Sequence, residues 1–405
     1  MFIDRNKMLA VYLSCALLFG LVLGFNPGNN LETVFLKPLD TSYSILGSRS
    51  VFKELTGGNR VYAFLPYWNL GHNNLNVDSI TDLSYFGLTV NAKGRIITND
   101  PPYTKWRKDE KLKETMQKVK KNGGRVSFTL ICHVEEDIDA ILACPACWNN
   151  LIEDVEQELT WAGIKDVNVD FEYPAYTTPE NAQKYSQLVG VLNKHLDSTI
   201  GDSFVVVSAY ADSADRATRS DVRLTDPKSL AENADALFIM AYDFHQPESA
   251  TAGPVSPLEG SYTTSRLNLT TALKAYLEVV PASKLILGLP FYGYNWVVED
   301  ALPMSTRIAG NESIGFSKSI SYAEVTDLLI KKQLTPLWDN TSKTPYVNYI
   351  DKETGSKHQI WYDNGESLKY KANLAQKNHL LGVGVWAVGF EGGYINLWDA
   401  FRTQL

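Results

Sequence analysis

The chain has 405 residues, of which 44% are hydrophobic, and it carries a formal net charge of −8. This length and hydrophobic content are enough to build a large folded core. The acidic balance argues against nucleic acid or an anionic membrane surface as the main partner, because both attract clustered Lys and Arg.

Residues 1–25 have the pattern of an export signal. Arg5 and Lys7 precede the apolar run Met8–Phe25. The length of this run fits either a signal peptide that is removed or an N-terminal membrane anchor that stays. Either one predicts a secreted protein or a protein anchored on the extracytoplasmic side of a membrane. Residues 26–58 are polar and are predicted to form a linker.

From residue 59 to residue 405 the sequence alternates between two kinds of segment. Short runs rich in β-branched and aromatic residues predict eight strands: Val61–Pro66, Leu83–Val90, Val126–Ile131, Val167–Phe171, Phe204–Ala209, Ala236–Tyr242, Leu285–Pro290 and Val383–Ala387. Between them lie helical patterns: Asp109–Lys121, Leu151–Trp161, Pro179–Leu196, Thr270–Val279 and Ser367–Leu380. This alternation predicts an α/β fold, a (β/α)8 TIM barrel.

The connection between the seventh and eighth predicted strands is too long for a plain barrel loop. It contains strand-like pieces at residues 346–350 and 358–362 and a helical pattern at residues 322–331. We therefore predict a small α+β insertion over residues 297–365.

The fourth predicted strand carries an unusual row of polar residues. Alternate side chains of a strand point to the same side, so Asn168, Asp170 and Glu172 share one face. Burial of such groups is costly unless they have dedicated partners. A solvated edge strand would favour a charge of opposite sign near Glu172, but Tyr173 and Pro174 follow it instead. We interpret the segment as an active-site strand.

Other candidate residues lie at the corresponding ends of further predicted strands. Catalytic groups of a TIM barrel gather at the carboxyl ends of its strands. Glu172 ends the fourth strand, and polar or aromatic side chains end three others: Tyr67, Trp68, Tyr242, Asp243 and Trp386. The predicted fold brings these distant segments to one mouth.

These motifs resemble the family 18 glycoside hydrolases, the chitinase family. The strand-four signature of that family, Asp-Gly-x-Asp-x-Asp-x-Glu, corresponds to residues 165–172. Its strand-six Met-x-Tyr-Asp corresponds to residues 240–243, and its strand-seven segment is similar to residues 284–293. Its strand-eight Trp corresponds to Trp386, and the likeness covers residues 61–400.

Within the family, the chain resembles the spore-germination and cortex-hydrolysing branch at Asn168, residues 294–296 and residues 358–363. It departs from the family signature at Lys165 and Asp166, where we expect altered packing more than altered chemistry. The strand-three Ser-x-Gly-Gly of the family is absent, and residues 127–132 stand in its place.

The resemblance implies a substrate-assisted, retaining mechanism with no cofactor and no metal. Glu172 would protonate the glycosidic oxygen and later activate water. Asp170 would orient the substrate acetamido group, to which Tyr242 would donate a hydrogen bond with help from Asp243. Trp386 would form the floor under the sugar. Three further aromatic residues are candidates for substrate binding: Tyr67, Trp68 and Tyr292.

Asn168 replaces the middle Asp of the signature. An amide cannot exchange a proton, but its NH2 group could hold Asp170 as an anion. The hypothesis is that Asn168 takes this catalytic supporting role, and that Asn168→Asp mainly shifts the pH profile of activity.

Three cysteines follow the leader: Cys132, Cys144 and Cys147. One disulfide is expected in an exported protein, and three pairings are open. A zinc site that includes His133 and a redox Cys-x-x-Cys are the alternatives. His133 and His245 follow predicted strands, and we interpret both as hydrogen-bonded structural groups rather than catalysts.

The expected function is hydrolysis of β-linked N-acetylglucosamine glycans by a monomer. Chitin or chitooligosaccharides, peptidoglycan and N-glycans are all open as substrates. Two other classes compete with this function. A non-catalytic chitinase-like glycan-binding protein would usually lack the acid that Glu172 supplies. A metal-dependent barrel hydrolase would need a convergent set of His residues, which the sequence lacks.

Overall fold

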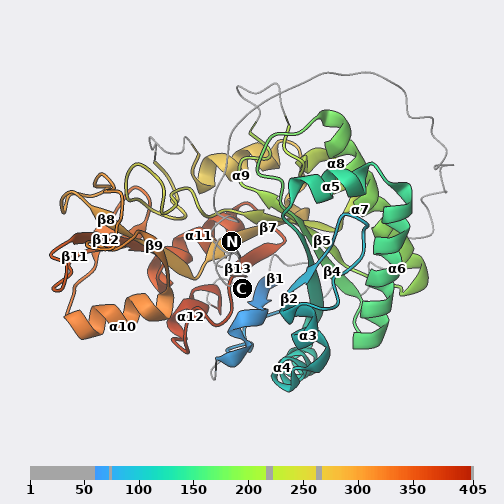
Figure 1. Cartoon of the computed structure of the whole chain (residues 1–405), viewed down its shortest axis with the longest axis horizontal. Coiled ribbons are helices and arrows are strands. Elements are labelled where there is room, and N and C mark those ends of the chain that lie inside the picture. Colours follow the sequence, from blue (N-terminus) through green and yellow to red (C-terminus); the bar gives the residue numbers. More distant parts are fainter. Residues whose placement is uncertain (1–59, 73–74, 216–221, 261–266, 403–405) are drawn as a thin grey trace, which may run out of the picture.

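The computed structural model describes residues 60–72, 75–215, 222–260 and 267–402. Eight parallel strands close into a barrel in the order β1-β13-β7-β6-β5-β4-β3-β2 (Figure 1). They are β1 (Arg60–Pro66), β2 (Asp82–Thr89), β3 (Arg125–Cys132), β4 (Asp166–Phe171), β5 (Val205–Tyr210), β6 (Ala236–Met240), β7 (Leu285–Pro290) and β13 (Gly382–Trp386). The predicted TIM barrel is confirmed. The predicted leader at 1–25 and linker at 26–58 lie outside the described residues.

The barrel is covered by helices: α3 (Pro101–Lys108), α4 (Glu110–Lys121), α5 (Glu135–Leu142), α6 (Pro145–Ala162), α7 (Pro179–Thr199), α8 (Pro227–Asn233), α9 (Leu269–Leu277), α11 (Gly365–Lys377) and α12 (Asn396–Arg402), with 3-10 turns η1 (Tyr67–Gly71) and η2 (Ala282–Lys284). Thr178 caps α7 by accepting a hydrogen bond from the backbone N–H of Asn181, and Pro179 occupies the first turn. Helices α3, α5, α8 and α12 are not among the predicted ones. Within the described ranges, no helix has both the length and the apolar character to cross a bilayer.

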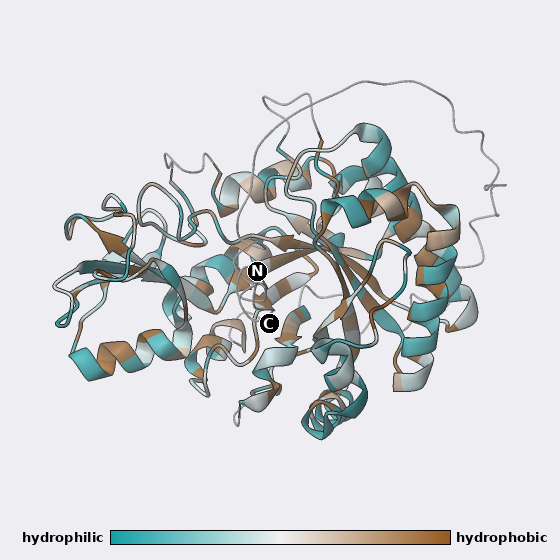
Figure 2. Ribbon diagram, in the orientation of Figure 1, coloured by the Kyte–Doolittle hydropathy of each residue, from teal (hydrophilic) through white to brown (hydrophobic). Residues whose placement is uncertain are grey.

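The barrel strands bury two faces, one toward the helices and one toward the barrel axis. On β4, Val167, Val169 and Phe171 belong to the outer core that the helices cover. A separate cluster fills the interior, where the rings of Phe64 and Phe238 lie 4.8 Å apart. Figure 2 shows the barrel strands mostly in brown and much of the surrounding helices in teal. The polar face of β4 therefore looks into the barrel.

Charged side chains close the amino-terminal end of the barrel. Arg60 at the start of β1 pairs with Asp82 of β2 at 2.5 Å. Arg125 of β3 forms two hydrogen bonds, of 2.7 and 2.6 Å, with Asp166 of β4. Asp166 stands where the family signature has Gly, and its ion pair with Arg125 lies at the end of the barrel opposite to Glu172.

A five-stranded antiparallel sheet follows β7 in the order β10-β11-β12-β8-β9. Its elements are β8 (Tyr292–Val298), β9 (Lys318–Ser321), α10 (Tyr322–Lys332), β10 (Leu337–Asp339), β11 (Thr344–Ile350) and β12 (Lys357–Tyr362). This unit is the α+β insertion, and it extends from one side of the barrel (Figure 1). Its first strand begins at Tyr292, so the predicted start at 297 falls inside β8.

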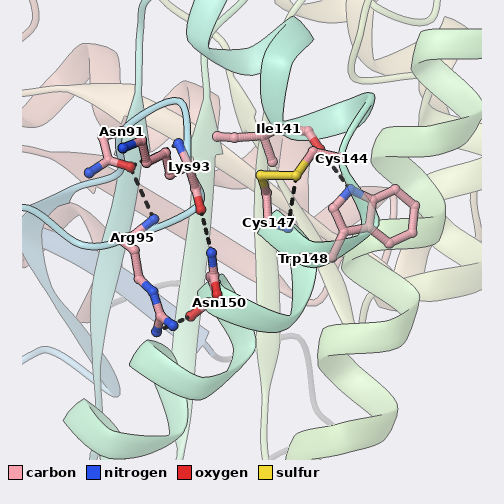
Figure 3. The surroundings of a disulfide bond; sticks show 8 residues. All are labelled: Asn91, Lys93, Arg95, Ile141, Cys144, Cys147, Trp148 and Asn150. Carbon is pink, nitrogen blue, oxygen red and sulfur yellow. Dashed lines mark hydrogen bonds between the residues drawn. A yellow bond between two sulfur atoms is a disulfide. The ribbon is translucent and has the colours of Figure 1, made fainter.

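One disulfide joins Cys144 to Cys147 at the start of α6, and Cys132 is free and buried. This pairing is one of the three that the sequence left open, and it excludes a zinc site built from all three cysteines. Figure 3 shows the surroundings of the bond. The side-chain amide of Asn150 in α6 donates to the carbonyl oxygen of Lys93 at 2.9 Å. The disulfide turn therefore packs against the turn that follows β2.

Candidate active site

The polar face of β4 ends in two carboxyl groups at the carboxyl end of the barrel. Asp170 is the fifth residue of the strand, and only 4% of its surface is exposed. Glu172 is the first residue after the strand, and its backbone N–H donates to the carbonyl oxygen of Cys132 at 2.9 Å. Its side chain is 18% exposed. The acid is thus accessible from the mouth, whereas Asp170 lies beneath it.

The Glu172 carboxyl has a different neighbour at each oxygen. Its Oε2 accepts a hydrogen bond of 3.1 Å from the Tyr210 hydroxyl, at the end of β5. Its Oε1 lies 3.3 Å from Nε2 of His133. Burial raises the pKa of Glu172 to about 7, with His133 opposing the shift and Asp170 adding to it. A carboxyl with this pKa is protonated in part at neutral pH, as a general acid requires.

Asn168 does not make the contact with Asp170 that the sequence suggested. Its amide NH2 lies 3.4 Å from the carbonyl oxygen of Val206, to which it donates, and its carbonyl accepts from the Ser208 hydroxyl at 3.3 Å. Asn168 is fully buried, and Asp170 Oδ1 has no hydrogen-bond partner. The expected bond between the two side chains is therefore wrong. Asn168 instead links β4 to β5.

Asn168→Asp is consequently expected to reduce stability. The new carboxylate would face the Val206 carbonyl without a proton to donate, at a cost of about 1–3 kcal/mol for a buried unsatisfied group. Burial raises the pKa of such a carboxyl in the folded state. The variant's loss of folding stability therefore appears above the carboxyl's pKa in the unfolded state, about 4, and grows as the pH rises. Urea unfolding at pH 5 and pH 8 measures this. An equal deficit at both pH values contradicts the explanation.

Tyr242 and Asp243 lie just past β6, which ends at Met240, two residues earlier than predicted. Asp243 has a left-handed backbone with φ of 61°, which Asp tolerates better than most residues. Its Oδ1 accepts hydrogen bonds from the hydroxyls of Tyr292 and Tyr294. Burial raises the pKa of Asp243 to about 6, and these two hydrogen bonds oppose the shift.

The Tyr242 hydroxyl lies in the same electrostatic environment as the β4 carboxyls. Its pKa is raised well above the usual value by burial first, and then by Asp170, Asp243 and Glu172. The hydroxyl therefore keeps its proton and is available as a donor. Tyr292, by contrast, is only 5% exposed. The structure places it behind Asp243 as a support, rather than in the substrate-binding position expected from the sequence.

Aromatic rings form one side of the mouth. Trp386 at the end of β13 is half-buried and packs on Phe86, with ring centroids 4.6 Å apart. The ring centroids of Trp68 and Trp386 lie 6.3 Å apart, and both rings pack against the interior cluster of the barrel. Tyr67 contacts Trp68 edge-on at 5.0 Å but packs against the outer core. Of the predicted pair, Trp68 is thus the one placed near Trp386.

Two residues of this site were missed by sequence reasoning. Tyr210 bonds Glu172 directly, although nothing in the sequence around it singles it out. His133, which we interpreted as a structural group, contacts Glu172 and lies 3.8 Å from Asp170. His245 has the structural role predicted for it, since its Nδ1 lies 2.9 Å from the carbonyl oxygen of Pro254 and burial lowers its pKa to about 4.

Among the residues that the structure describes, one group could offer three ligand atoms to a metal: His133, Asp170 and Glu172, within 4.8 Å of one another. Metal binding requires deprotonated ligands. A Glu that donates a proton to its substrate cannot hold a metal at the same moment. The raised pKa of Glu172 therefore favours proton chemistry for this group.

The fold and the carboxyl groups at its mouth indicate the class of the protein, a barrel enzyme with a candidate general acid. Comparison with known families makes the class specific. The model for glycosyl hydrolases family 18 matches residues 61–391, and the chain belongs to that family.

Relatives of the chain include both chitobiases and cortex-lytic enzymes. The chain is 28% identical to "Probable di-N-acetylchitobiase 1" of Dictyostelium discoideum, over 92% of this chain and 89% of the relative. It is 22% identical to the "Cortical fragment-lytic enzyme" of Bacillus subtilis, over 62% of this chain and 53% of the relative. The structure of the Group IV chitinase of Ostrinia furnacalis in complex with allosamidin has the same fold, with a TM-score of 0.72 at 21% identity over 85% of this chain and 98% of that one.

Proposed function

We propose that this protein is an exported hydrolase of β-linked N-acetylglucosamine glycans that retains the anomeric configuration by using the substrate's own acetamido group as nucleophile. The difference in burial between Asp170 and Glu172 carries the proposal. Asp170 is 4% exposed and lies below the acid, so we assign it the role of hydrogen-bond acceptor for the acetamido group rather than that of an enzyme nucleophile. The accessible Glu172 supplies the proton, and the sugar must supply the nucleophile.

The reaction follows from these positions. Glu172 gives its proton to the glycosidic oxygen while the acetamido oxygen attacks the anomeric carbon, which forms an oxazolinium ion and releases the leaving sugar. Asp170 accepts a hydrogen bond from the acetamido N–H and balances the positive charge. Tyr242 donates to the acetamido oxygen and fixes its direction. Glu172, now an anion, takes a proton from the water that opens the ring, which restores the acid.

Short N-acetylglucosamine oligosaccharides are the substrates that we favour. The di-N-acetylchitobiase relative matches nearly the whole chain, whereas the cortex-lytic relative matches about three-fifths of it. Peptidoglycan is the second candidate because of that cortex-lytic relative. The export part of the proposal is supported by the apolar leader in residues 1–25.

A series of aryl chitobiosides tests the proposed nucleophile. Fluorine atoms are added one by one to the N-acetyl group of the sugar whose glycosidic bond is cleaved. Each fluorine withdraws electrons from the acetamido oxygen. We expect kcat to fall steeply along the series, and the first-formed product to have the β configuration by NMR. A rate independent of fluorination, or an α product, contradicts substrate assistance. Parallel digestion of chitooligosaccharides and peptidoglycan then identifies the natural class.

The pH dependence of hydrolysis follows from the acid. Glu172 must be protonated to act, and its pKa is about 7. We expect kcat/KM for a chitobioside to have an alkaline limb with an apparent pKa near that value, and to fall about tenfold for each further pH unit. Initial rates between pH 4 and pH 9 measure the limb. A limb near pH 4.5, the value of an ordinary Glu, contradicts this assignment.

A further inference from the structure

The interior face of β3 continues beyond the end of the strand to His133. Ile131 packs against the interior cluster and is in register with Asp170 of β4. Cys132, the next residue, points the other way and belongs to the outer core. Because side chains alternate along an extended chain, His133 takes the next interior position, beside Glu172.

The imidazole lies between the two carboxyl groups of β4. Its Nε2 is 3.3 Å from Glu172 Oε1 and 3.8 Å from Asp170 Oδ2. Neither approach has the direction of a hydrogen bond. Both are nonetheless within ion-pair distance, and the side chains of His133 and Glu172 are only 28% and 18% exposed. At this depth a charge on His133 is only partly screened from Glu172 by water.

We propose that His133 is a positioning residue that holds the Glu172 carboxyl and competes with it for the catalytic proton, and that it thereby sets the alkaline limit of hydrolysis. The proposal rests on the glycosidase function proposed for the same site. It adds a residue that the strand-three motif of the family, Ser-x-Gly-Gly, does not contain.

The groups that face Glu172 act in opposite directions. His133 on β3, when charged, favours the carboxylate, and so does the hydrogen bond from Tyr210 on β5. Asp170 on β4 and Asp243 beyond β6 favour the protonated acid. His133 therefore lowers the pH up to which the acid keeps its proton, and removal of the imidazole should raise that pH.

Two variants separate the charge of His133 from its shape. His133→Gln keeps an N–H donor close to the position of Nε2 without a charge, and His133→Phe keeps a ring without nitrogen. In both, we expect the alkaline limb of kcat/KM to move up by about 0.5–1 pH unit, the low end of the effect of a neighbouring charge. At pH 8 each variant should then keep about three to five times more of its own maximal activity than the wild type does.

A matched control is available on the outer surface. His195 and Glu156 form a similar pair at 2.7 Å, with side chains 35% and 38% exposed. His195→Gln should leave the limb where it is in the wild type. If His133 only maintains structure, both His133 variants lose activity in parallel at every pH and the limb stays in place. That result would overturn the proposal.

A second measurement does not depend on activity. The chain has six His residues, so imidazole nitrogen signals can be followed by NMR, and the His133 signal is the one absent from His133→Gln. Coupling between two groups is reciprocal. The titration midpoint of His133 should therefore fall in Glu172→Gln relative to the wild type, and an unchanged midpoint contradicts the proposal. If the titrations of His133 and Glu172 are coupled but the protein cleaves no N-acetylglucosamine oligomer, the proposed function is refuted. The electrostatic interaction between His133 and Glu172 is then still supported.

Discussion

Replacement of Glu172 by Gln is expected to lower kcat for chitooligosaccharides about 10³-fold, within the range that general acid catalysis contributes. Gln fills the same space and can still accept from the Tyr210 hydroxyl, which donates to Glu172 in the wild type. It has no proton to give to the glycosidic oxygen. The natural leaving group is a sugar alkoxide, which departs only with such a proton.

The leaving group provides an internal check on this loss. An aryl glycoside with an acidic phenol needs little protonation, so its loss of kcat in Glu172→Gln should be much smaller than the loss for a chitooligosaccharide. Glu136→Gln is the matched control, because Glu136 is exposed on α5. It should keep full activity. Retained oligosaccharide cleavage by Glu172→Gln, or equal losses for both leaving groups, would remove Glu172 from the role of acid.

The same substitution should leave the protein at least as stable as the wild type above neutral pH. Burial raises the folded-state pKa of Glu172 to about 7, above the ordinary value of 4.5. The ionised carboxylate therefore destabilises the folded state progressively from pH 4.5 to 7, and fully above pH 7. Gln lacks that charge. Loss of activity without loss of stability distinguishes a chemical defect from unfolding.

The strand-four pattern predicted that Asp170 and Glu172 share one face, and the structure places their carboxyl groups on either side of His133 Nε2. Polar residues at every second position of a buried parallel strand need partners inside the barrel, and Asp170 and Glu172 lie beside His133 at its mouth, whereas Asn168 bonds to β5. The same alternation places His133, but only if the register between β3 and β4 is known, because Ile131 must be seen to pair with Asp170. Register depends on tertiary packing, and one sequence does not contain it.

Other details depended on contacts between distant segments. The role of Tyr292 follows from the turn after β6, which brings Asp243 against its hydroxyl. The boundary of the insertion was placed late because β8 is buried throughout, is mostly aromatic or aliphatic, and begins only two residues after β7. The two strands therefore read as one apolar stretch. The unpredicted helices α3, α5, α8 and α12 have only seven or eight residues, too few to show a clear period.

A buried ion pair ties the end of the insertion to the barrel. Asp363 directly follows β12, and its carboxylate accepts a hydrogen bond from Lys371 of α11. Both side chains are 0% exposed; Lys371 donates to Asp363 Oδ1, and the other carboxylate oxygen, Oδ2, has no hydrogen-bond partner. Burial lowers the pKa of Lys371, while Asp363 works against this shift. Each charge therefore depends on the other for compensation.

Lys371→Met is expected to destabilise the protein by about 3–5 kcal/mol, because it leaves a buried carboxylate without its partner. The double variant Lys371→Met/Asp363→Leu should recover most of this loss, since apolar groups of similar volume replace a buried pair at little cost. The exposed pair of Lys113 and Glu110, at 2.7 Å, offers the control. Lys113→Met should cost less than about 1 kcal/mol, as surface ion pairs do.

Urea unfolding of these variants at several pH values measures the effect and its cause. Acidification neutralises the carboxylate left without its partner in Lys371→Met, so the deficit of the single variant should shrink as the pH falls. The double variant has no such carboxylate and should show no comparable change. If the single and double variants were equally unstable, the loss would come from the packing of the Lys371 side chain rather than from an uncompensated charge. The argument for an electrostatic link between the insertion and the barrel would then fail.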